Sequence, residues 1–145
     1  MTSDIDKTLT PQEIGAALMR RDKTSKWLSI ILKTIDEGGA TMSMKVKSEM
    51  LNGHDMCHGG FIFTLADTAF AYACNSRNRK TLALNCVINY VVAVREGETL
   101  TASAKEVCLA GRTGVYDVSV TNESGTTVAT FRGTSYGTSS PSVEG

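Results

Sequence analysis

The sequence predicts an α+β fold in which one curved antiparallel β-sheet wraps around a long central helix. Two observations predict it: an almost wholly apolar stretch over residues 57–76, and strand patterns on both sides of that stretch. A helix that is apolar nearly all round is buried on most sides. A strongly curved antiparallel sheet would enclose it, and pairing between subunits would cover the edge strands that such a sheet leaves.

Length and composition indicate a single domain, residues 1–145, with an ordered core over about 12–136 and polar tails at both ends. The 15 basic and 15 acidic side chains balance, so nothing indicates a nucleic-acid or membrane partner. The longest apolar stretch is shorter than the roughly 20 residues that span a bilayer. The N-terminus is polar and acidic, unlike a signal peptide, and the expected location is cytoplasmic.

Before the central stretch, the chain predicts one helix and two strands. Thr10 and Pro11 are typical of a helix N-cap and first turn, and the helix is expected over 11–22. The Ile- and Leu-rich residues 26–36 predict a strand, 37–39 a turn, and the alternation over 40–47 a half-buried strand. A loop over 48–57 then leads into the central helix.

After a basic turn at 76–80, the pattern predicts four strands that we interpret as a meander. They are expected over 81–94, 99–109, 114–121 and 127–136, with turns between them. The last residues, 137–145, are expected to be disordered.

The central stretch contains no Pro and is rich in Ala and Leu, so it predicts one helix of about four turns. Asp67 lies in its middle, and Lys and Arg are absent from position 48 to position 76. A buried carboxylate requires a hydrogen bond, an ion pair or a raised pKa. Two interpretations remain open: an Asp that bonds the Thr64 or Thr68 hydroxyl or faces solvent, and an Asp with a chemical role.

The helix opens with His58, Gly59 and Gly60. Two glycines leave the first N–H groups without side-chain cover, at the positive end of the helix dipole, where a carbonyl oxygen or oxyanion can bind. The alternative interpretation of the two glycines is an ordinary turn before a helix. Gly59 and Asp67 are eight residues apart, about 12 Å along a helix. If both act on one bond they come from different subunits, which predicts a dimer with the site at its interface.

The cysteines and histidines do not form a metal-ligand pattern. The four cysteines stand far apart with no CxxC pair, and the two histidines, His54 and His58, have no acidic cluster beside them, so no metal is expected. Cys57 beside His58 is a weak candidate nucleophile, because adjacent side chains rarely face one another. His58 is either a hydrogen bonder that orders the loop or a catalytic contact, and His54 is interpreted as structural.

The order of elements, with HGG at the start of the central helix and an acid eight residues after the first Gly, resembles the hotdog fold. The stretch LNGHDMCHGGFIFTLADTAFAYACNS resembles the phenylacetate-degradation thioesterases of the PaaI type, as do GRTGVYDV and TVATFRG. The resemblance covers residues from about 12 to 136.

This resemblance implies hydrolysis of acyl-CoA thioesters, with phenylacetyl or hydroxyphenylacetyl groups favoured. Coenzyme A is then part of the substrate, and no separate cofactor is implied. Asp67 would be the nucleophile or the general base. The Gly59 N–H, with Gly60 behind it, would polarise the thioester carbonyl. Family members are typically homotetramers, built as dimers of dimers.

The remaining site residues also follow from the resemblance. Asn52 and His58 would hold the substrate carbonyl or the water, and Thr68 would steady the carboxylate of the opposing site. Substrate contacts are expected in the GRTG turn and the last strand, at Arg112, Thr113, Gly114 and Arg132.

Independently of the resemblance, the basic side chains are candidates for the CoA phosphates: Arg77, Arg79, Lys80, Arg112 and Arg132. The alternative for each is a solvated turn or strand residue.

Two rival functions remain open. A hotdog dehydratase or hydratase would require a catalytic His paired with an acid across the interface. A non-catalytic acyl-CoA binding module could dispense with the acid.

Overall fold

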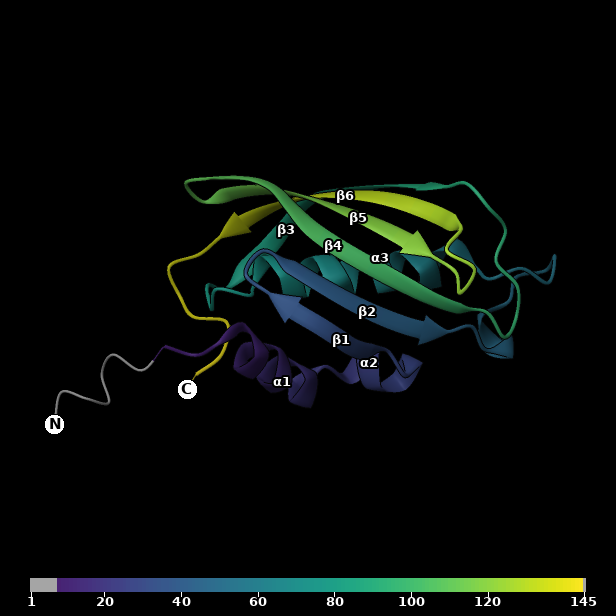
Figure 1. Ribbon diagram of the computed structural model, residues 1–145, viewed down its shortest axis with the longest axis horizontal. Coiled ribbons are helices and arrows are strands. Elements are labelled where there is room, and N and C mark those ends of the chain that lie inside the picture. Colours follow the sequence, from purple (N-terminus) through teal and green to yellow (C-terminus); the bar gives the residue numbers. More distant parts are fainter. Residues whose placement is uncertain (1–7, 145) are drawn as a thin grey trace, which may run out of the picture.

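The computed structural model describes residues 8–144 and contains one six-stranded sheet that curves around a long helix, with two shorter helices beside it (Figure 1). In chain order the elements are α1 (Pro11–Arg21), α2 (Lys23–Leu28), β1 (Ile31–Asp36), β2 (Gly39–Lys45), a 3-10 turn η2 (Ser48–Met50), α3 (Gly59–Cys74), β3 (Thr81–Tyr90), β4 (Thr99–Ala110), β5 (Thr113–Thr121) and β6 (Thr127–Gly137). The predicted α+β class and the enclosed central helix are confirmed.

The core lies between α3 and the inner face of the sheet. Leu65, Ala66, Ala69 and Phe70 of α3 are at most 1% exposed. Alternate residues of the strands face them, because successive side chains of a strand point to opposite faces. These inward residues include Met42, Met44, Leu100, Ala102, Tyr116, Val118, Val120 and Phe131.

The strand order is β1-β2-β4-β5-β6-β3, and every neighbouring pair is antiparallel. The predicted four-strand meander is therefore wrong in one respect: β3 pairs with β6, whereas β4 pairs with β2. The apolar residues of β2 belong to the same core, so β2 takes the place beside β4 and β3 becomes the opposite edge. The other edge, β1, has α1 packed on it, since Leu32 and Ile35 lie against Gly15.

Two predicted strands differ from the observed bounds by more than two residues. Residues 26–36 were expected to be one strand, but α2 extends to Leu28 and the strand begins only at Ile31. Asp22 caps this helix by accepting a hydrogen bond from the Ser25 N–H at 2.9 Å, and Ser29 ends it with φ 56°. The strand expected over 81–94 ends at Tyr90, because the chain then crosses towards β4, with the N–H groups of Val91 and Val92 donating to the Val128 carbonyl.

The C-terminal residues that were expected to be disordered have defined contacts up to residue 144. The Val143 side chain is 4% exposed, and its backbone exchanges two hydrogen bonds with the Asn78 side chain, at 2.9 and 3.0 Å. Figure 1 shows this segment running from the end of β6 towards α1. The expected N-terminal tail lies largely outside the described residues.

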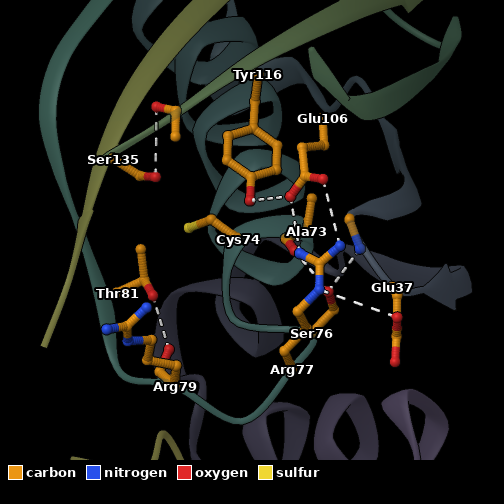
Figure 2. Close-up of polar contacts among 12 residues, drawn as sticks. Glu37, Ala73, Cys74, Ser76, Arg77, Arg79, Thr81, Glu106, Tyr116 and Ser135 are labelled. Carbon is orange, nitrogen blue, oxygen red and sulfur yellow. Dashed lines mark hydrogen bonds and ion pairs between the residues drawn. The ribbon is translucent and has the colours of Figure 1, made fainter. Parts of the chain in front are cut away.

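Polar contacts fix the C-terminal end of α3 to the sheet (Figure 2). Arg77 donates to both carboxylate oxygens of Glu106, at 2.7 and 3.2 Å, and lies 3.9 Å from Glu37. The buried Tyr116 hydroxyl donates to Glu106 at 3.0 Å. The Ser76 hydroxyl accepts from the Gly38 N–H at 2.8 Å. The end of α3 is thus bonded to the β1–β2 turn and to β4.

No helix between residues 8 and 144 has the length and apolar character needed to cross a lipid bilayer.

We expect Gly133→Ala to lower the free energy of unfolding by about 1–3 kcal/mol, because overpacking a filled core forces side chains to move. A Cβ at Gly133 would lie 2.7 Å from the Phe70 ring. The matched control is Gly53→Ala, whose Cβ meets nothing within 4 Å. Urea unfolding of both variants measures the difference. Equal stability of the two variants would show that the sheet yields at Gly133 without strain.

Candidate active site

The loop before α3 is ordered by its own side chains. The Asn52 side-chain oxygen accepts hydrogen bonds from the N–H groups of His54 and Met56, at 2.9 and 3.2 Å. Leu51 and Cys57 pair as an antiparallel bridge, and the His58 N–H donates to the Met50 carbonyl at 2.7 Å. Asn52 can therefore offer a substrate only its amide nitrogen, for which the described residues provide no partner.

His58 is the N-cap of α3. Its Nδ1 accepts a hydrogen bond from the Gly60 N–H at 3.0 Å, which orders the first turn of the helix. The predicted role of His58 as a loop-ordering hydrogen bonder is confirmed; a catalytic contact through its other nitrogen stays a prediction. Because His58 occupies the Gly60 N–H, the donor left open at this helix start is the Gly59 N–H, which has no acceptor among residues 8–144.

Tyr90 explains why position 59 is a glycine. Its hydroxyl donates to the Gly59 carbonyl at 2.9 Å, and a Cβ at Gly59 would lie 2.9 Å from the Tyr90 ring. The ring therefore fixes the backbone whose N–H is open. Sequence reasoning missed Tyr90. It lies 31 positions after Gly59, at the end of an expected strand, and no local pattern connects the two residues.

Asp67 lies half-buried in the middle of α3 and has no ion-pair partner in the described part of the chain. Burial raises the pKa of its carboxyl above the usual value of an Asp. The alternative of a bond to a threonine hydroxyl is wrong, since Thr64 donates to the Gly60 carbonyl at 2.9 Å and Thr68 to the Thr64 carbonyl at 2.6 Å. An underhydrated, unpaired carboxylate of this kind is available as a base or nucleophile.

The neighbour of Asp67 is Cys86 of β3, whose Sγ lies 3.9 Å from an Asp67 oxygen. A thiol is a weak donor, and this contact partly offsets the effect of burial on the Asp67 pKa. Burial and the nearby carboxylate raise the pKa of the Cys86 thiol. No spacing rule in the sequence indicates this pair.

Gly59 and Asp67 lie eight residues apart on one continuous helix, about 12 Å apart along its axis. One protomer cannot bring both to a single carbonyl group. The edge strand β3, which carries Cys86, is exposed and apolar, with Leu82, Leu84, Val87 and Tyr90 all at least 49% exposed.

The substrate contacts that were predicted in the later strands lie away from Asp67. Arg112, Thr113 and Gly114 are at the β4–β5 turn, where Arg112 donates to the Gly137 carbonyl at 3.0 Å. Arg132 forms a two-pronged ion pair with Asp117, at 2.6 and 2.8 Å, on the face of the sheet opposite α3. The structure does not bring these residues beside Asp67.

A cavity of about 1090 Å³ opens beside Ala71, one helical turn beyond Asp67. Its lining includes the cations Arg20, Arg21 and Lys80 and the carboxylates of Asp22 and Glu144. None of the three cations has an ion-pair partner among residues 8–144. Of the predicted phosphate contacts, Lys80 alone lines this cavity, whereas Arg77 is held by Glu106 and Arg79 donates to the Thr138 carbonyl. Sequence reasoning missed Arg20 and Arg21, which end a helix far away in the chain.

Other chemistries have little support in this geometry. Burial raises the pKa of the Cys57 thiol to about 11, so a thiolate nucleophile is disfavoured at neutral pH. Between residues 8 and 144, no three His, Cys, Asp or Glu side chains gather as metal ligands.

Comparison with known proteins gives concordant matches. A family model described as the thioesterase superfamily matches residues 54–129. Over 120 residues the chain is 46% identical to acyl-coenzyme A thioesterase PaaI of Escherichia coli (strain K12), with 83% of this chain and 86% of the relative covered.

Solved structures agree. The E. coli PaaI protein from the phenylacetic acid degradation operon matches with a TM-score of 0.89 and 42% identity, covering 90% of this chain and 95% of that one. A Streptococcus mutans UA159 protein bound to acetyl-CoA matches with a TM-score of 0.74 and 29% identity, covering 77% and 90%.

We expect the Asp67 carboxyl to titrate above the usual range of an Asp, and Cys86→Ala to raise its pKa further, because this variant removes the hydrogen bond that favours the charged form. Carbon-13 NMR titration of the carboxyl carbons measures the pKa, with Asp67→Asn used to assign the signal. Cys86→Ser, which keeps a donor, is the control. An unchanged or lower Asp67 pKa in Cys86→Ala would contradict the expectation.

Proposed function

The chain belongs to the thioesterase superfamily and is a thioester hydrolase; we propose that it hydrolyses acyl-CoA with a preference for aryl-acetyl groups such as phenylacetyl or hydroxyphenylacetyl. The predicted hotdog fold and the resemblance to PaaI-type thioesterases are confirmed by the matches. The aryl-acetyl preference is supported by the E. coli relative of the phenylacetic acid degradation operon, and CoA as carrier by the relative bound to acetyl-CoA.

The observation that carries the reaction is that α3 presents an open N–H at its start and, in its middle, a carboxylate without an ion-pair partner among residues 8–144. The Gly59 N–H, left open because His58 occupies the Gly60 N–H, donates a hydrogen bond to the thioester carbonyl oxygen and stabilises the negative charge that develops there. The Asp67 carboxylate either takes a proton from the attacking water or attacks the carbonyl carbon itself. In both routes the C–S bond breaks and CoA leaves as a thiolate. In the second route, water then hydrolyses the mixed anhydride formed between Asp67 and the acyl group, which releases the acid and restores the carboxylate. In both routes water supplies the OH of the acid and the proton of the thiol.

The site is shared between two protomers. Gly59 and Asp67 of one chain are too far apart for one carbonyl, so Asp67 faces the Gly59 N–H of a partner. The partner docks along β3, whose open backbone groups and exposed apolar side chains provide the free edge of the sheet. In this arrangement Thr68 lies near the partner's site. Two such dimers would form the tetramer that the family resemblance implies.

Two of the predicted residues, Asn52 and His58, act on the substrate at the start of α3, and a set of cations acts beyond Asp67. Asn52 offers its amide nitrogen, and His58 its second ring nitrogen, to the carbonyl or the water. Arg20, Arg21 and Lys80 line the cavity beyond Asp67 and are the free cations best placed for the CoA phosphates.

We expect Asp67→Asn to lower kcat for phenylacetyl-CoA by at least about 100-fold while substrate binding is kept, since the variant removes the base or nucleophile but not the shape. Thiol release is measured for a panel of aryl- and alkyl-acyl-CoA thioesters, and binding by calorimetry. Thr64→Ser, one turn earlier on α3, is the control. A wild-type protein that binds acyl-CoA but releases no thiol from any of them would instead be a binding module.

We expect two inactive variants to restore activity when mixed. Gly59→Pro removes the N–H at the first position of the helix, where the backbone tolerates proline. Gly59→Ala keeps the N–H and controls for the contact of the added Cβ with the Tyr90 ring. Random pairing of Gly59→Pro with Asp67→Asn gives half mixed dimers with one intact site each, about one quarter of wild-type activity. The mixture is refolded together and assayed for thiol release. If both groups served one site within a chain, the mixture would stay inactive.

A further inference from the structure

Trp27 is a large apolar side chain that the fold leaves outside its core. Its indole is 71% exposed, although it lies on α2, a helix that is otherwise firmly attached. The next residue, Leu28, is 4% exposed in the core, and Asp22 at the start of α2 accepts a hydrogen bond from the Tyr72 hydroxyl of α3 at 3.0 Å. The exposure of Trp27 is therefore a property of a fixed surface and not of a loose end.

Trp27 is connected to the candidate site by a row of rings. Its ring centroid lies 6.4 Å from that of Phe61, at 56°, and Phe61 lies 6.4 Å from His58, at 83°. Phe61 belongs to the first turn of α3, directly after Gly59 and Gly60. The row thus begins at the residue that leaves the Gly59 N–H open and ends at the exposed indole.

From this geometry we infer that Trp27 and Phe61 form the acyl subsite, a wall that contacts the aryl group of the substrate. This inference rests on the proposed function, since it places the thioester oxygen on the Gly59 N–H. A thioester carbonyl carbon carries two arms: an amide-containing pantetheine that ends in phosphates, and the acyl group. The ring row suits the apolar acyl arm, because pantetheine amides would lose hydrogen bonds against it.

The positions of the cations support the same orientation of the substrate. The unpaired cations Arg20, Arg21 and Lys80 line the cavity beyond Asp67, not the ring row beside Gly59. With Asp67 contributed by one protomer and Gly59 by the other, the phosphates point towards the first protomer and the acyl group towards Trp27 of the second. Aryl groups gain the most binding free energy at these rings, because aromatic rings that meet at a tilt attract one another beyond the effect of burial alone.

The test uses the fact that Trp27 is the only tryptophan of the chain, so its emission reports on this position alone. Asp67→Asn protein is titrated with phenylacetyl-CoA, hexanoyl-CoA and CoA, and binding is followed in parallel by calorimetry. We expect phenylacetyl-CoA to shift and quench the emission, hexanoyl-CoA to do so less, and CoA to leave it unchanged.

Kinetics supply the second readout. We expect Trp27→Ala to lower the ratio of kcat/KM for phenylacetyl-CoA over acetyl-CoA by about twofold to tenfold, and Trp27→Phe to keep most of it. Val107→Ala, which trims an exposed apolar side chain on β4, is the matched control and should leave the ratio unchanged.

The inference is overturned if phenylacetyl-CoA binds without an emission change, if CoA alone changes the emission equally, or if Trp27→Ala keeps the ratio. An emission maximum that depends on protein concentration and not on ligand would assign Trp27 to a contact between copies of the chain. Loss of the proposed function is distinguishable, because a protein that hydrolyses no thioester fails in thiol release whatever Trp27 reports.

Discussion

The burial of α3 is the constraint on which the rest of this structure depends. A helix with so little polar surface is stable only when most of its sides are covered, and one curved sheet covers it. Phe70 packs so closely against β6 that only a glycine fits at position 133. The need to enclose α3 also brings β2 beside β4 and leaves β3 as the free edge.

Both ends of the same helix are fixed by polar contacts that differ in kind. At the N-terminus, His58 occupies one N–H and Tyr90 holds the Gly59 carbonyl, so a single donor stays open. At the C-terminus, Arg77 and Ser76 bond α3 to β4 and to the β1–β2 turn. A helix held in this way presents Gly59 and Asp67 at constant separation, and preorganised groups of this kind stabilise developing charge without first reorganising.

A fixed separation that is too long for one substrate makes the dimer part of the proposed chemistry. In that arrangement, the edge strand β3 joins the protomers and also carries Cys86, the neighbour of Asp67. The two ends of the substrate then meet different surfaces: cations beyond Asp67 and aromatic rings beside Gly59. This asymmetry gives the CoA and acyl arms distinct directions across the interface.

The sequence by itself determined the enclosed helix, its HGG start, the isolated Asp67 and most strands, because these depend on local composition and periodicity. The separation of Gly59 and Asp67 also followed from helix geometry alone. Tertiary structure decided the rest: α2 at the start of an expected strand, the pairing of β3 with β6, and the neighbours Tyr90 and Cys86, which lie 31 and 19 positions from their partners. Local patterns carry no information about such contacts, because the closing of the sheet around α3 alone brings those residues together.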